Sequence, residues 1–180
     1  MRRSILLSLC IGFFLLFYSE CIAQSGISVG FGIPEYLHID YKWHNEQTGY
    51  SFALGTLPGS DEFLLSGRLG FLYHFYGRRN YSLIKSWYIN PGVAYNAVKA
   101  EGNIDQYLML DMRIGREFSI NHSWGVFTEL GAMYIFWKKT ENANFNFVFN
   151  YDSSILPTLN LGLYYRFPLG CNCPKIKTKP

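Results

Sequence analysis

Hydrophobic and polar residues alternate along most of this chain from Ser25 onward. A period of two places successive side chains on opposite faces of a β-strand, whereas an amphipathic helix needs apolar residues three and four positions apart. No window keeps that helical spacing for more than a turn or two. The pattern predicts strands at Gly26–Ile33, Tyr36–His44, Gly49–Leu57, Phe63–Tyr76, Leu83–Val98, Gln106–Phe118, Ser123–Trp137 and Ile155–Phe167.

The two faces of these strands differ in chemistry. One face is almost entirely apolar and carries no charge, as in Ile27, Val29 and Phe31 of the first strand. The opposite face is polar and rich in glycine and charge. An uncharged outward band is what a transmembrane barrel requires, whereas in a soluble sandwich or barrel the apolar face would be the core.

Three features favour the membrane. Tyr, Trp and Phe gather near the strand ends, as in the interfacial girdles of membrane barrels. The polar face is poor in Lys and Glu for a surface in water. The connections also alternate: one set is short and polar, and the other includes the long segment Lys138–Ser154. We therefore predict an all-β fold, a closed eight-stranded antiparallel up-and-down transmembrane barrel over residues 24–167, whose interior is filled and has no open pore.

The first 23 residues have the three-part pattern of a secretory signal peptide. Arg2 and Arg3 precede an apolar run, and Cys21-Ile22-Ala23 is a small-residue cleavage site before Gln24. An uncleaved membrane helix and lipidation at Cys21 are the alternatives. With this segment removed, the barrel has its termini in the periplasm, residues 168–180 form a periplasmic tail, and the location is the outer membrane of a Gram-negative bacterium.

The composition and net charge exclude two further classes of protein. The 180 residues are 49% hydrophobic and 18% aromatic with 16% charged, which excludes disorder. A formal net charge of +3 gives no electrostatic footprint for nucleic acid.

The pattern resembles the small eight-stranded outer-membrane barrels of the OmpX and OmpA-transmembrane type and the PorT-like outer-membrane β-barrel proteins of Bacteroidota. Trp124–Phe136 and the closing strand Leu159–Phe167 carry the resemblance together with the signal peptide. It implies membrane lipid as a partner, and recognition of the last strand, ending at the aromatic Phe167, by the outer-membrane assembly machinery. The family's terminal strand usually ends the chain, whereas Pro168–Pro180 follows here.

The polar face supplies the candidate functional groups. Buried charges persist only when they are paired, so a structural network inside the barrel is the interpretation we favour over an ion path. We expect no metal and no cofactor. The predicted lumenal charge network contains Asp40, Lys42, Arg68, Asp111, Arg113, Glu129 and Arg166.

Catalysis is the competing hypothesis, because some eight-stranded barrels modify lipid A. That chemistry needs a His with a Ser and a carboxylate at the outer end. Only His38 falls near the outer rim, and the pair His122-Ser123 with Glu129 lacks the required spacing. We therefore expect no enzyme.

Two further segments are candidates for interactions. The long outer loop alternates Asn with aromatic residues, which either extend a hairpin or offer a strand edge to a protein or glycan: Phe145, Phe147, Phe149 and Tyr151. In the tail, Cys171 and Cys173 could form a disulfide in an oxidising periplasm. Pro91, inside a predicted strand, indicates a bulge or a shifted register.

The sequence thus predicts a non-enzymatic barrel with a structural, surface-interaction or secretion-accessory role. The alternatives are a lipid A-modifying enzyme of the outer leaflet and a soluble periplasmic ligand-binding barrel.

Overall fold

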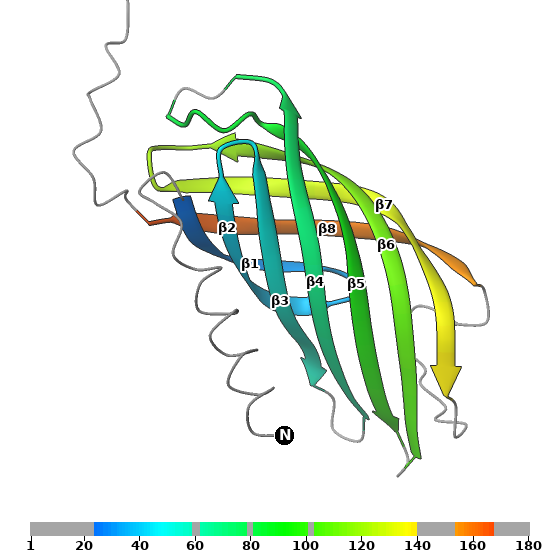
Figure 1. The fold of residues 1–180 in the computed structure, drawn as a ribbon. Coiled ribbons are helices and arrows are strands. Elements are labelled where there is room, and N and C mark those ends of the chain that lie inside the picture. Colours follow the sequence, from blue (N-terminus) through cyan, green and yellow to red (C-terminus); the bar gives the residue numbers. More distant parts are fainter. Residues whose placement is uncertain (1–23, 59–61, 79–80, 101–102, 140–153, 168–180) are drawn as a thin grey trace, which may run out of the picture.

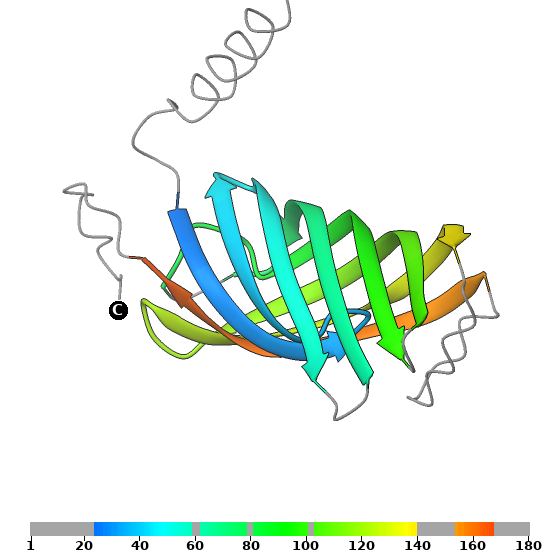
Figure 2. The same cartoon turned by 90° about the horizontal axis from the view of Figure 1, so that it is seen from below.

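The computed structural model describes residues 24–58, 62–78, 81–100, 103–139 and 154–167. They form one closed antiparallel barrel of eight strands, in which each strand pairs with the next and β1 pairs with β8 (Figures 1 and 2). The strands are β1 (Gln24–Ile33), β2 (Tyr36–Asn45), β3 (Thr48–Pro58), β4 (Glu62–Tyr76), β5 (Trp87–Ala100), β6 (Asn103–Ser119), β7 (Trp124–Lys139) and β8 (Ile155–Arg166). The predicted fold class is confirmed.

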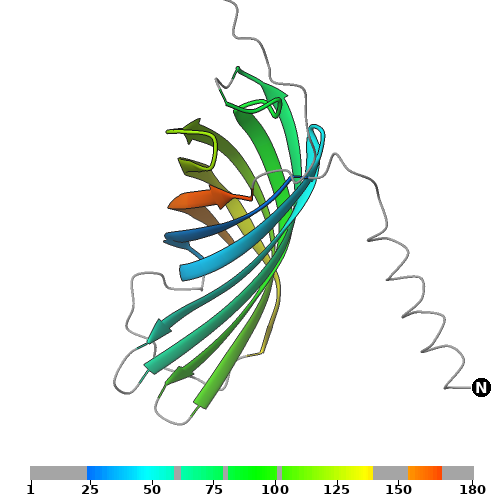
Figure 3. The ribbon, with the colours of Figure 1, turned by 90° about the vertical axis from the view of Figure 1, so that its left-hand side faces the viewer.

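The barrel has two different ends. We call the end that holds Gln24, Phe167 and the β2–β3 and β6–β7 turns the near end, and the end that holds the β1–β2 turn and the last residues of β3, β5 and β7 the far end (Figure 1). β1 and β2 have 10 residues each, whereas β6 has 17, so the β1–β2 hairpin stops short of the far end reached by β4 to β6 (Figures 1 and 3). As a result, Ile155–Thr158 of β8 pair with β7 and have no partner on β1.

The alternation of the sequence sets which face points inward. Leu110, Leu130 and Leu161 point outward and are 49%, 57% and 53% exposed, whereas Arg68 and Arg113 point inward and are 3% and 1% exposed. This orientation is the reverse of a soluble barrel with an apolar core. Among the described residues, no helix has the length and hydrophobicity needed to cross a membrane.

Most predicted strand boundaries differ from the observed ones by one or two residues, the start of β6 differs by three, and the start of β5 differs by four. β5 begins at Trp87 and not at Leu83, because residues 81–86 fold across the near end of the barrel instead of extending the strand. The last strand ends at Arg166, and Phe167 lies just outside it, where its N–H donates to the Ser25 carbonyl at 2.9 Å.

The expectation of a bulge or shifted register at Pro91 is also wrong. The β4–β5 register is the same at Gly70↔Gly92 and at Tyr73↔Ile89, on either side of the proline, and Pro91 stays paired with Met112 on β6. A missing N–H therefore interrupts one ladder locally without moving the strand. The register shifts lie elsewhere, at His74/Tyr76 and at Leu108/Met109.

Candidate functional site

Charged side chains from three strands and one turn meet in the middle of the barrel. We call Glu35, Arg68, Asp111, Arg113 and Glu129 the central charge cluster. Arg113 on β6 contacts three carboxylates: Nε lies 2.5 Å from Asp111, Nη2 lies 2.6 Å from Glu35 and Nη1 lies 3.3 Å from Glu129. Arg68 on β4 binds Asp111 at 2.9 Å and lies 3.5 Å from Glu35. All five side chains are buried, so the cluster is held together by mutual neutralisation.

Glu35 enters this cluster from a turn. The Pro34–Glu35 turn between β1 and β2 folds into the barrel, and Asn96 on β5 donates to the Pro34 carbonyl at 3.3 Å. The approach needs Gly55 on β3, because a Cβ at that position would collide with the Glu35 backbone. The predicted network did not include Glu35. The short β1–β2 hairpin beside much longer strands is the feature that brings its turn inside.

Neutral donors complete the coordination of Glu129. One of its oxygens accepts from Tyr88 Oη at 2.7 Å and Asn90 Nδ2 at 3.2 Å, and the other accepts from Asn160 Nδ2 at 3.2 Å besides Arg113. A carboxylate with four donors is fixed in place and ionic. It joins its own strand, β7, to β5, β6 and β8.

Between the central charge cluster and the near end, the ion pair Arg166–Glu117 joins β8 to β6. The guanidinium carbon of Arg166 lies 4.6 Å from the centroid of the Tyr164 ring. Lys42 on β2 makes a loose ion pair with Asp40 at 3.6 Å, and its Nζ lies over the Phe127 ring at 4.1 Å. The sequence analysis missed Glu117, although the period of two that places Arg113 inside also places Glu117 inside.

All seven residues of the predicted network face the interior. They comprise four cations and three carboxylates, and Glu35 and Glu117 raise the carboxylates to five. Asp105, also buried, adds a sixth at the far end of β6. When every group carries its usual charge, the charged groups of the described interior therefore have a small negative net charge. The predicted set alone would have a positive net charge.

Residues 81–86 close the near end. Gln47, in the β2–β3 turn, donates to the Leu83 carbonyl at 3.1 Å and accepts from the Lys85 N–H at 3.0 Å. His74 Nδ1 lies 2.7 Å from the Lys85 carbonyl, and Ile84 and Ser86 are buried. Beside this cap, a small hollow at the near end is lined by Gly26, Ile27, Lys42, His44, Glu117, Tyr164, Tyr165 and Arg166.

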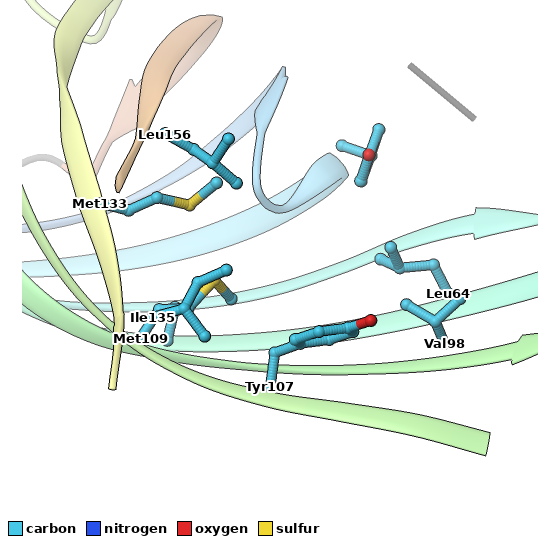
Figure 4. Packing of buried hydrophobic residues seen from close by; sticks show 9 residues of the cluster. Leu64, Val98, Tyr107, Met109, Met133, Ile135 and Leu156 are labelled. Carbon is cyan, nitrogen blue, oxygen red and sulfur yellow. The ribbon is translucent and has the colours of Figure 1, made fainter. Parts of the chain in front are cut away.

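The far half of the interior holds a cluster of apolar side chains beside a few buried polar ones such as Asn96 and Asp105. Figure 4 shows buried side chains from β4 to β8 pointing toward one another, among them Leu64, Met109, Met133 and Leu156. The interior face of this half is therefore less polar than expected. The apolar cluster consists of Tyr36, Leu64, Ala94, Val98, Tyr107, Met109, Met133, Ile135 and Leu156.

Within the described residues, the His, Ser and carboxylate groups that the catalytic alternative would need are not brought together. His38 Nδ1 lies 3.0 Å from the Tyr36 carbonyl, while Ser28 donates to Asp40 at 3.3 Å, so neither group activates the other. His122 is exposed against Tyr81, whereas Glu129 is buried in the barrel. No group of three or more His, Cys, Asp or Glu within the described ranges is placed to hold a metal ion.

Several predicted features lie outside the described residues. These are the signal peptide at residues 1–23, the loop aromatics Phe145, Phe147, Phe149 and Tyr151, and the tail with Cys171 and Cys173.

Comparison with known proteins supports the fold. No protein-family model and no curated protein matches the sequence. Among solved structures, the chain is similar to CarO of Acinetobacter baumannii, with a TM-score of 0.52 and 15% identity over 80% of this chain and 97% of that one. CarO2 of the same organism gives a TM-score of 0.50 and 15% identity over 80% and 98%. Neisserial surface protein A (NspA) gives 0.45 and 11% over 80% and 94%.

These similarities extend over nearly the whole length of each CarO protein. At 15% identity they show a shared barrel fold and carry no residue-level correspondence. The expected resemblance to small eight-stranded barrels is thus supported for the fold, and the PorT-like assignment gains no support from them.

Proposed function

We propose that this protein is a non-enzymatic outer-membrane β-barrel with a sealed interior and a structural role in the membrane. The observation that carries the proposal is the polarity of the wall. Its outward side chains are mostly exposed and apolar, whereas most of its charged inward side chains are buried and ion-paired. Such a surface is stable against hydrocarbon and unfavourable in water, because a soluble monomer rarely exposes an apolar patch larger than a few hundred Å².

The height of the apolar band fits a bilayer. On β6 the outward positions Leu108, Leu110, Met112 and Ile114 lie between the polar Gln106 and the charged Arg116. At roughly 3.3 Å per residue and a tilt of about 40°, the ten steps from Gln106 to Arg116 rise roughly 25 Å along the barrel axis. An outward apolar band of about 25 Å is typical of outer-membrane barrels.

The filled interior supports a role without conduction. The cap of residues 81–86, the central charge cluster and the apolar cluster follow one another between the near and far ends. The expected result is an absence of discrete conductance steps when purified protein is added to a planar lipid bilayer, with a known porin as the positive control. Stable single-channel steps would contradict the sealed interior.

Membrane location has its own test. Cells that produce the protein are fractionated, and the barrel is followed on gels with and without boiling. We expect it in the outer-membrane fraction, with a faster-migrating band in the unboiled sample. A protein that stays in solution without detergent would overturn the proposal and favour the soluble ligand-binding alternative.

The finer roles need separate tests. A lipid A-modifying enzyme would change the mass spectrum of lipid A between cells with and without the gene, and we expect identical spectra. For a surface-interaction role, deleting residues 142–150 and measuring adhesion tests the long loop directly, and unchanged adhesion would count against it. A secretion-accessory role would instead show as lost export of other proteins in cells without the gene.

A further inference from the structure

Arg116 is a cation on the lipid-facing side of the barrel. It lies on β6 between the outward residues Ile114 and Phe118, and it is exposed. Its guanidinium carbon lies 4.6 Å from the Phe118 ring centroid and 5.2 Å from that of Trp87, its pairing partner on β5. Two aromatic faces therefore hold the group at the surface.

The N–H groups of the Arg116 guanidinium are not used in an ion pair with the described residues. No carboxylate of the described residues forms an ion pair with Arg116, whereas Arg68, Arg113 and Arg166 are all paired. A guanidinium carries five N–H donors arranged to bind a phosphate or carboxylate with two parallel hydrogen bonds. On the other side, β7 pairs Thr128 with Arg116, which adds an outward hydroxyl next to it.

The apolar side chains next to Arg116 indicate which kind of anion would bind there. On the barrel surface toward the far end, Ile114 is paired with Ile89 on β5 and with Leu130 on β7, and all three side chains are exposed. An anionic group bound by Arg116 therefore lies at the border of the apolar band, with an apolar surface running away from it. A membrane glycerophospholipid has this arrangement, since its phosphate sits at the interface and its acyl chains extend into the hydrocarbon.

We propose that Arg116, with Thr128 and Trp87, binds the phosphate of a glycerophospholipid in the leaflet at the near end, whose acyl chains lie on Ile89, Ile114 and Leu130. This site rests on the membrane location proposed above. It gives the barrel a binding site for a lipid phosphate at one point of its circumference.

Binding of phosphatidylglycerol to purified barrel in a neutral detergent, measured by native mass spectrometry over a lipid titration, tests the site. The variant is Arg116→Gln, and the matched control is Lys99→Gln, which removes an exposed cation from β5 near the far end. Loss of hydrogen bonds to a charged group predicts about tenfold weaker binding of the first lipid for Arg116→Gln. Lys99→Gln is expected to change it less than about twofold, and Arg116→Lys to fall between the two.

Two probes identify the source of the phosphate. Diacylglycerol with the same chains, which lacks the phosphate, is expected to bind wild type and Arg116→Gln equally. Inorganic phosphate at the same concentration is expected not to displace the lipid. Displacement by inorganic phosphate would make this a general anion site and overturn the lipid assignment.

Equal binding of phosphatidylglycerol by wild type and Arg116→Gln would overturn the site, as would an equal loss in Lys99→Gln. Heat-modifiable migration of each variant shows that the barrel is intact. A wild-type protein that is soluble without detergent would instead refute the membrane location, so the two failures are distinguishable.

Discussion

Glu35 and Arg113 are 78 positions apart in the chain, and their side chains meet at 2.6 Å inside the barrel. The first comes from the shortest hairpin and the second from the longest strand. Their contact joins the β1–β2 turn to the opposite wall and places a backbone segment across the interior. The barrel is thus filled by its own chain and not only by side chains of its wall.

Replacing Glu35 with Gln is expected to lower the free energy of unfolding by about 2 kcal/mol, because Arg113 and Arg68 each lose a charged partner. The loss stays below the 3–5 kcal/mol typical of a fully broken buried pair, since Asp111 still contacts both arginines. Urea unfolding in phospholipid vesicles, followed by tryptophan fluorescence, measures it.

Glu46→Gln is the matched control, because Glu46 is exposed in the β2–β3 turn. It is expected to change stability by less than about 0.5 kcal/mol. Equal effects of the two substitutions would show that the turn does not depend on its contact with the arginines.

Leu110→Arg tests the outward band. Leu110 lies midway between the polar ends of that band on β6, where an arginine facing lipid costs about 2–4 kcal/mol. Ile120→Arg, in the β6–β7 connection at the near end, is expected to cost about 0–1 kcal/mol. Unfolding free energies of both variants in vesicles provide the comparison, and a larger cost at Ile120 would place the membrane differently.

Leu64→Ala tests the packing of the apolar cluster. Leu64 is completely buried in the far half of the interior, so its truncation is expected to cost about 2–5 kcal/mol. Leu83, in the near-end cap, is 82% exposed, and Leu83→Ala is expected to stay within about 0.5 kcal/mol. A small cost at Leu64 would mean that the far half of the interior is loosely packed.

Gln47→Ala tests how the near-end cap is held. The substitution removes both hydrogen bonds to residues 83 and 85 but no buried apolar group, so local opening should increase while global stability falls by about 1–2 kcal/mol. Trypsin cleavage after Lys85 is expected to speed up several-fold relative to Thr48→Ala, a neighbouring turn variant. An unchanged cleavage rate would show that other contacts hold the cap.

Period-two alternation was enough to predict the barrel, because one register places Leu110 outside and Arg113 inside at once. The same rule, followed two steps further, reaches Glu117. Glu35 could not be found in this way, since a turn has no alternation and its direction depends on the lengths of the neighbouring strands. The start of β5 was misjudged for a related reason: residues 83–86 have the composition of a strand, but Gln47 draws their backbone across the near end.

The barrel is closed by its first and last strands, β1 and β8, from Gly26↔Arg166 to Ile33↔Leu159. No shorter piece of the chain can complete the sheet, because a fragment that stops before β8 has two open edges and an apolar outer surface with nothing to cover it. The whole polypeptide must therefore be synthesised and kept from aggregating before the sheet can close. Folding becomes a single late event, decided by the last dozen residues of the wall.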